Sequence, residues 1–190
     1  MTKFIIEDGI FKAYFGKDAV VVVPEGVTQL GGDISDIDRA RGLFGDIIGY
    51  KAFFQNKFIK ELYLPDSVTE IGFKSLEHCS NLEVLSFSSN MKTLGCNAVV
   101  GCNALKKIIF RGTIYEFSCL CFAGQTLDLE VVYCTDGQIL FGKDREYYID
   151  TLYFPGTRAE WDSKYSTNDW RNRRCKKIVC LSDTADTLDF

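Results

Sequence analysis

The stretch LYLPDSVTEIG at residues 62–72 reads as a short strand, a turn and a second short strand. A near copy, VVVVPEGVTQLG, stands at residues 20–31. A chain that contains the same strand–turn–strand unit twice is built from repeats, so this unit decides the fold.

The unit recurs because the sequence matches itself at a shift of 23 residues over segments 59–81, 82–104 and 105–126. A period of roughly 20 to 29 residues with an L-x-x-L-x-L core is the signature of a leucine-rich solenoid. A lone repeat cannot bury its apolar face, so stability requires several stacked neighbours. The apolar residues coincide in four columns: Ile59, Leu82 and Leu105; Leu62, Leu85 and Ile108; Leu64, Phe87 and Phe110; and Ile71, Leu94 and Phe117.

The phrase LPDSVTEIG, with a Cys shortly before the next apolar run, resembles the BspA-type leucine-rich repeat. Units of that family run as a short strand, Pro, a turn, VTxIG, an AF segment and Cys. IGYKAF at residues 48–53 fits the middle of this unit. The resemblance covers residues 4–124 closely and 125–184 more loosely. It implies a right-handed solenoid used for protein or surface recognition, in bacterial proteins that are often secreted or surface-attached.

We therefore expect a leucine-rich repeat right-handed solenoid of the α/β class, with mostly short parallel β-strands and short helical turns on the convex side. Residues 1–184 would form a single domain and residues 185–190 a frayed tail. Residues 32–49 interrupt the repeats as an insertion. We interpret it either as a short amphipathic helix, begun by Asp33 or Ser35, that covers a flank of the solenoid, or as a partner-binding element. The expected parts are an N-terminal hairpin and first repeat at 1–31, an insertion at 32–49, regular repeats of 23 residues at 50–124, and atypical C-terminal repeats with a cap at 125–184.

A second duplication lies outside the 23-residue period. IIFRGTIYEF at 108–117, followed by VVYCTDG at 131–137, is echoed by LYFPGTRAEW at 152–161, followed by IVCLSD at 178–183. In the second copy we expect Thr157 to begin a short helix and Trp161 to pack onto the stack, as part of a closing cap.

The tetrapeptide FGKD occurs at residues 15–18 and again at 141–144, each time between apolar or aromatic residues. Such flanks are what a tight hairpin requires, so both copies predict a strand–turn–strand unit.

Composition and charge exclude several classes of function. The net charge of −4 opposes broad nucleic-acid binding, and the one basic cluster, RNRRCKK at 171–177, reads as a solvated turn. No apolar stretch approaches the roughly 20 residues that a membrane helix needs. The N-terminal stretch carries Glu7 and Asp8 where a signal peptide would be apolar, which favours a cytoplasmic protein. The resemblance favours the cell surface or secretion instead.

The chain has eight cysteines and a single histidine, which are the residues that could bind a metal, form a disulfide or act as a nucleophile with its base. Cys79 aligns with Cys102 in neighbouring repeats, near bridging distance, but a column of free thiols also suits an apolar core, and we expect reduced cysteines. No C-x-x-C pair exists, so we expect no metal and no cofactor. His78 has no acidic partner that would activate a nucleophile, and Asp136 and Asp183 read as turn residues.

If the chain binds a partner, the outward residues of the strands are the natural site, because the leucine columns point inward with a period of two. Both outward columns carry few charges, and their tyrosines and aliphatic residues suit recognition. A second copy of the chain, or hairpins, could equally cover this face. One column is Val22, Tyr63, Ser86, Ile109, Tyr133 and Tyr153, and its neighbour is Val20, Glu61, Val84, Lys107, Val131 and Thr151.

The sequence therefore predicts a non-enzymatic binding scaffold for a protein partner or surface ligand. The alternatives are a structural segment of a larger cell-surface protein and an uncharacterised hydrolase. The hydrolase would need two convergent carboxylates in one cleft.

Overall fold

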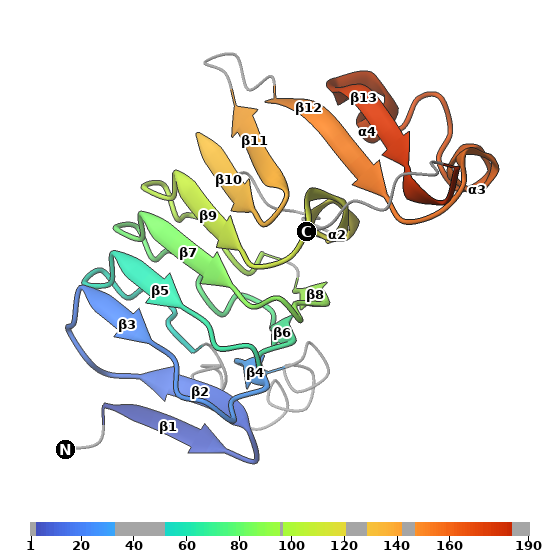
Figure 1. Cartoon of the computed structure of the whole chain (residues 1–190). Coiled ribbons are helices and arrows are strands. Elements are labelled where there is room, and N and C mark those ends of the chain that lie inside the picture. The colour runs from blue at the N-terminus through green and yellow to red at the C-terminus, as the bar shows by residue number, and fades with distance from the viewer. Residues whose placement is uncertain (1–2, 33–51, 96, 121–128, 142–146, 184–190) are drawn as a thin grey trace, which may run out of the picture.

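The computed structural model describes residues 3–32, 52–95, 97–120, 129–141 and 147–183 (Figure 1). Its described strands form two sheets. The long sheet has the strand order β13-β12-β11-β10-β9-β7-β5-β3, and the short sheet has the order β1-β2-β4-β6-β8. Figure 1 shows the strands of the long sheet stacked one above another from the N-terminal to the C-terminal end of the chain.

The regular repeats form a parallel ladder in the long sheet. Its strands are β3 (Val20–Val22), β5 (Glu61–Tyr63), β7 (Val84–Phe87), β9 (Lys107–Phe110) and β10 (Val131–Cys134), paired in this order. The predicted register is confirmed, because Leu62 pairs with Leu85 and Leu85 with Ile108. All three side chains are fully buried, so the leucine columns point into the core.

The same repeats form a second ladder in the short sheet. β2 (Ile10–Tyr14), β4 (Gln29–Leu30), β6 (Glu70–Ile71) and β8 (Thr93–Leu94) pair in parallel in this order. LYLPDSVTEIG is therefore a strand, a turn and a second strand, as its sequence predicts, and each half joins a different sheet.

In the repeats that contain residues 73–79 and 97–101, turns take the place of the expected short helices, whereas the last regular repeat has the short helix α2 (Ile114–Cys119). The backbone shows why, because Lys74 and His78 both adopt positive φ, at 56° and 60°. L-residues adopt that conformation singly and do not continue an α-helix through it. Backbone bonds still join neighbouring repeats here: the N–H of Leu76 donates to Ala98 O at 2.8 Å and that of His78 to Val100 O at 2.7 Å.

The N-terminal hairpin differs from its prediction. β1 (Phe4–Glu7) pairs with β2 around a turn at Asp8 and Gly9. The first FGKD, at 15–18, is the corner that takes the chain from β2 in the short sheet to β3 in the long sheet, so it is not a hairpin turn. Asp18 holds this corner by accepting hydrogen bonds from Lys3 at 2.8 Å and from the Tyr14 hydroxyl at 2.6 Å.

A hairpin was also predicted at the second FGKD, residues 141–144, and the strands on either side of it pair as a hairpin requires. β11 (Gly137–Phe141) and β12 (Tyr147–Phe154) pair antiparallel, with Phe141 opposite Tyr147. β10 also pairs antiparallel with β11, so the long sheet is mixed at this end.

The second duplication is visible in the structure as two strand–helix–strand units. α2 (Ile114–Cys119) connects β9 to β10, and α3 (Arg158–Lys164) follows β12 and precedes α4 (Trp170–Arg174) and β13 (Cys175–Cys180). β9 pairs in parallel with β10, and β12 with β13. Each unit ends near an Asp, the second one in the 3-10 helix η1 (Leu181–Asp183).

Both helices of these units begin with the same cap. The Thr113 hydroxyl accepts from the N–H of Glu116, and the Glu116 carboxylate accepts from the N–H of Thr113 at 2.7 Å. Thr157 and Glu160 repeat this arrangement at 2.6 Å, which confirms that Thr157 begins a helix. Trp161 is fully buried against Phe154, at a ring centroid distance of 5.3 Å.

Two predicted segments lie outside the described residues: the insertion with its expected helix from Asp33 or Ser35, and the tail at 185–190. No helix in the described part of the chain is long and apolar enough to span a membrane.

Candidate functional site

The predicted binding surface is the side of the long sheet that faces away from the leucine columns, and we call it the outer face. Strand pairing sets Val22, Tyr63, Ser86, Ile109 and Tyr133 side by side in one row. The same pairing sets Val20, Glu61, Val84, Lys107 and Val131 in the second row. The outward columns expected from the sequence therefore exist from β3 to β10.

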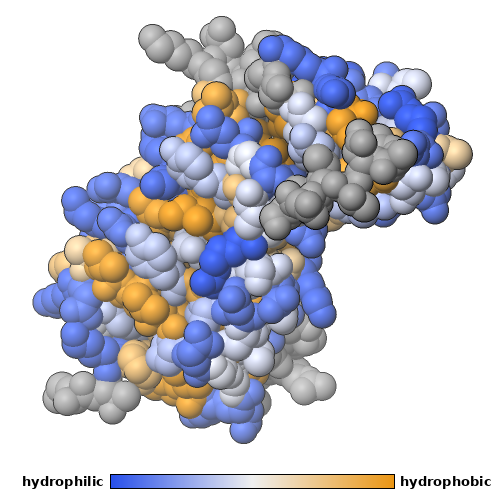
Figure 2. Space-filling view, in the orientation of Figure 1, coloured by the Kyte–Doolittle hydropathy of each residue, from blue (hydrophilic) through white to orange (hydrophobic). Residues whose placement is uncertain are grey.

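Accessibility varies along these rows. Val22, Val20 and Tyr133 are exposed, at 69%, 53% and 42%. In the first row, Tyr63 and Ile109 are half-buried. In the second row, every residue except Val20 is half-buried. Figure 2 shows hydrophobic residues over β3 and again further along the stack. The accessible apolar surface is therefore largest near β3 and near β10.

Ser86 does not fit the prediction of an accessible contact. Its side chain belongs to the outer face by register, but it is only 4% exposed. Tyr63 and Ile109 flank it on the neighbouring strands, and both side chains are much larger than a serine. The physical reason is that a small residue between two large ones lies below the surface that they form.

Tyr153 and Thr151 leave their expected columns. Tyr153 pairs with Val179 and Thr151 with Lys177 on β13, and β11 lies between β10 and β12. Tyr133 is therefore followed across the sheet by a residue of β11 and not by Tyr153.

Two outer-face residues were missed by the sequence reasoning. Leu140 lies opposite Val131 and Gln138 lies opposite Tyr133, because β11 pairs antiparallel with β10. Leu140 is 47% exposed, which adds a large aliphatic side chain beside Val131 in the second row. The predicted hairpin at 138–149 could have pointed to these residues. Its sequence, however, does not say which strand of the sheet the hairpin pairs with.

Two polar contacts order the aromatic side chains of the outer face. The Tyr63 hydroxyl donates to Glu61 Oε2 at 2.6 Å, and this bond to a carboxylate raises the pKa of Tyr63. Lys107 Nζ lies 5.1 Å from the centre of the Tyr133 ring, within range of a cation–π interaction. Tyr133 therefore presents its ring to solvent beside an ammonium group that can bind a carboxylate.

The residues considered for catalysis have structural contacts. Asp136 accepts from the N–H of Ile114 at 2.8 Å, and Asp183 accepts from the N–H of Arg158 at 2.5 Å. Each carboxylate thus caps the first turn of a helix. His78 is exposed on a turn, and its ring lies against Gly101 of the next repeat.

The cysteines that the structure describes are free thiols. Cys79 and Cys102 are buried, and their thiols donate to Phe53 O at 3.0 Å and Leu76 O at 3.1 Å. The hydrogen bond with Cys102 and burial both raise the pKa of Cys79, so it is no thiolate nucleophile at neutral pH. Within the described ranges, no group of three His, Cys, Asp or Glu residues is placed to hold a metal ion.

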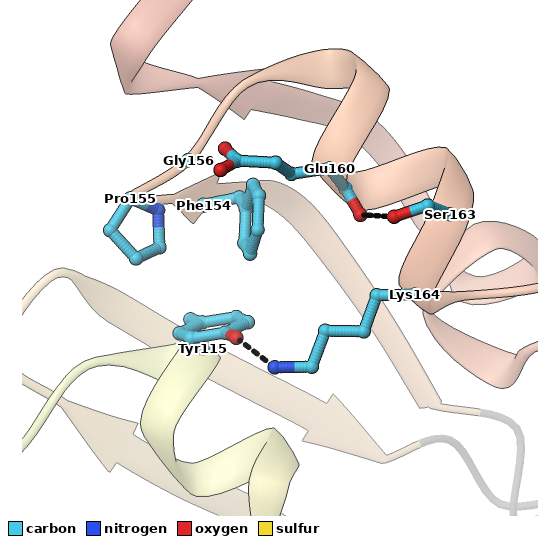
Figure 3. Close-up of a pocket in the computed structure, with 7 residues that line it drawn as sticks. All are labelled: Tyr115, Phe154, Pro155, Gly156, Glu160, Ser163 and Lys164. Carbon is cyan, nitrogen blue, oxygen red and sulfur yellow. Dashed lines mark hydrogen bonds between the residues drawn. The ribbon is translucent and has the colours of Figure 1, made fainter.

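An open hollow of about 480 Å³ lies between α2 and α3 (Figure 3). Tyr115 and Phe154 form its apolar wall with an edge-on ring contact at 5.2 Å, and Lys164 Nζ donates to the Tyr115 hydroxyl at 3.3 Å. Glu160 on its rim belongs to the cap of α3. A second hollow, of about 630 Å³, lies between α3 and β13. Each hollow is lined by one carboxylate, Glu160 in the first and Asp162 in the second, so neither holds the pair that a hydrolase would need.

Comparison with known proteins identifies the repeats. The model of the BspA type leucine rich repeat region matches residues 45–138 with 6 copies. No curated protein matches the chain. A solved leucine-rich repeat protein of T. pallidum is 14% identical with a TM-score of 0.43, and the match covers 93% of this chain and 78% of that one.

A leucine rich cell surface protein from Faecalibacterium prausnitzii is 13% identical with a TM-score of 0.38, and the match covers 80% of this chain and 62% of that one. The matched residues include the unit LYLPDSVTEIG, whose two strands, β5 and β6, belong to the two ladders. Residues 45–138 therefore consist of BspA-type leucine-rich repeats.

Proposed function

We propose that the chain is a non-enzymatic binding scaffold, a right-handed leucine-rich solenoid whose outer face binds a protein partner or a surface ligand. The observation that carries the proposal is the chemistry of the outer face from β3 to β11. Val20, Val22, Tyr133 and Leu140 are exposed there, and Glu61 and Lys107 are the charged residues of its two rows. Interfaces favour exposed apolar and aromatic residues with few charges in this way.

Tyr133 is the proposed anchor of that surface. Its ring is exposed and lies 5.1 Å from Lys107 Nζ, and Gln138 lies opposite it on β11. An aromatic ring with a free hydroxyl offers a large contact area at a low cost in conformational entropy, which is why tyrosines dominate the binding energy of many interfaces. Tyr63, Ile109, Glu61, Val84 and Lys107 would form the half-buried surroundings of the anchor.

The test is capture of a partner from the source cell, with identification by mass spectrometry, followed by titration of the Tyr133→Ala variant. We expect its melting temperature to stay within a few degrees, because an exposed side chain contributes little to the core. We expect partner affinity to fall at least about tenfold. Ser86→Ala is the matched control, since Ser86 lies in the same row but is covered, and it should bind as the unmodified protein does.

Two results would overturn the proposal. A loss of stability with Tyr133→Ala would show that the ring is part of the core. Unchanged stability together with unchanged affinity would move the binding surface away from the outer face, and the segment at 32–49 would become the next candidate.

We also propose that the protein works at the cell surface or outside the cell. The family assignment supports this location over the cytoplasmic one that the N-terminal sequence favours. Labelling intact source cells with a membrane-impermeant amine reagent tests it. Labelled protein supports the surface location, and label that appears only after lysis contradicts it.

A further inference from the structure

We propose that two copies of this chain associate through the free edge of β3, pairing antiparallel about Val21 to join their long sheets. This proposal does not rest on the function assigned to the outer face, because it concerns the backbone edge of one strand. It commits to a second copy of the chain as the occupant of that edge.

Among the strands that the structure describes, β3 has a neighbour on one edge only. β3 ends the strand order of the long sheet, with β5 as its neighbour there. Ala19 O accepts from the N–H of Lys60 at 2.7 Å, and the N–H of Val23 donates to Tyr63 O at 2.9 Å. Backbone groups alternate in direction along a strand, so those of Val20 and Val22 point away from β5. An open edge of this kind is a template for another strand.

The surroundings of this edge are unusually apolar. Val20 and Val22 are exposed, and Phe15 and Phe58 beside the start of β3 are 67% and 49% exposed. Lys17 Nζ, in the corner before β3, lies 5.3 Å from the centre of the Phe58 ring. Figure 2 shows the hydrophobic patch over β3. Apolar side chains gathered in this way on a surface mark a site of interaction.

The other end of the long sheet has the opposite character. β13 carries Lys176 and Lys177, and Arg173 precedes it on α4. Proteins use such charged residues to keep edge strands from pairing with other chains. β3 consists of three valines, so the strand itself carries no charged residue.

The sequence around β3 favours a two-fold register centred on Val21. In that register, Val20 of one copy lies opposite Val22 of the other, and their outward-pointing N–H and C=O groups can exchange hydrogen bonds. Lys17 then lies opposite Glu25 of the other copy, and the two-fold axis repeats the pair. A register centred on Val20 or Val22 loses this match of charges. Pro24 ends the pairing, because it has no N–H to donate.

Such a contact is small, so the association should be weak. Two strands of three residues with their flanking rings fall at the low end of specific interfaces, and we expect a Kd between about 1 μM and about 1 mM. Sedimentation velocity of the full chain over that concentration range should show a reversible monomer–dimer equilibrium.

Charge reversal tests the register. Lys17→Glu and Glu25→Lys should each weaken the dimer about tenfold, because each turns two attractive pairs into repulsive ones. The double variant Lys17→Glu/Glu25→Lys should restore the original Kd. Val22→Lys should weaken the dimer as well, whereas Leu140→Lys, on an exposed position of β11 away from the edge, should leave it unchanged. Thermal melts of each variant establish that the monomer is folded.

A chain that stays monomeric up to about 1 mM overturns the proposal. A dimer that is insensitive to Val22→Lys, or that Leu140→Lys disrupts, uses another surface and overturns it too. A dimer that the single reversals weaken and the double reversal does not restore contradicts the register centred on Val21.

Discussion

Asp136 and Asp183 make the same hydrogen bond in the two halves of the internal duplication. Asp136 Oδ1 accepts from the N–H of Ile114, and Asp183 Oδ2 accepts from the N–H of Arg158, each at the first residue of a helix. Asp136 comes just after β10, the strand that follows α2, and Asp183 comes just after β13, the strand that follows α3 and α4. The bond therefore ties the end of one strand to the start of the preceding helix in both units.

Replacement of Asp136 by Ala should lower the free energy of unfolding by about 0.5 to 2 kcal/mol, the usual cost of losing a side-chain acceptor at a helix start. Asp136→Asn keeps an acceptor oxygen and should cost less. Denaturant melts measure both. Asp162→Ala is the control, since Asp162 is exposed and pairs with the exposed Arg158, and the substitution should change stability by less than about 0.5 kcal/mol. Equal losses for Asp136→Ala and the control would contradict the capping role.

Replacement of Leu85 by Ala should cost about 2 to 5 kcal/mol, because the side chain is fully buried between Leu62 and Ile108 of the neighbouring repeats. Val84→Ala is the matched control, since Val84 is the preceding residue but lies half-buried on the outer face, and it should cost less than about 1 kcal/mol. A loss below about 1 kcal/mol for Leu85→Ala would show that the inward column is misassigned.

The regular ladder could be predicted because one spacing fixes it. A shift of 23 residues aligns Leu62, Leu85 and Ile108, and the period of two then assigns every neighbour to one side of the sheet. Accessibility could not be predicted in this way. Ser86 has the outward register of Tyr63, yet its two larger neighbours cover it.

Long-range pairing set the other limits of the sequence reasoning. The two FGKD segments are identical, but one is followed by a strand of the other sheet and one by a strand of the same sheet. Tyr153 left its column because β11 inserted between β10 and β12. Neither fact is encoded in the local sequence, since both depend on which strands meet in space.

Thiol reactivity should separate the cysteines by burial. Burial raises the pKa of Cys134 to about 12 and that of Cys175 to about 11, whereas Cys119 is exposed. Brief alkylation of the native protein at about pH 8 should modify Cys119 well before Cys79, Cys102, Cys134, Cys175 and Cys180, because the thiolate is the reacting form. Peptide mapping by mass spectrometry gives the order.

After unfolding without reductant, all eight cysteines should be alkylated, as expected for reduced thiols. A count of four or fewer would show that disulfides form in the natural protein. A Cys79 that reacts as fast as Cys119 in the folded state would contradict its burial.

Replacement of Gly101 by Ala should lower the free energy of unfolding, and the size of this loss should depend on whether His78 is present. Gly101 has a φ of +76°, at the turn position that Gln55 and His78 occupy in the preceding repeats with φ of 57° and 60°. Those two residues show that the fold accepts a side chain in this conformation, at a cost of about 1 to 2 kcal/mol. A Cβ on Gly101 would in addition overlap the His78 ring.

Gly101→Ala should therefore lower the free energy of unfolding by more than the cost of the left-handed conformation alone, that is, by more than about 2 kcal/mol. In the His78→Ala background the overlap is removed, and the same substitution should cost only about 1 to 2 kcal/mol. A double-mutant cycle from urea melts measures the difference. Equal costs in the two backgrounds would show that the ring moves aside freely, and that φ alone explains the glycine.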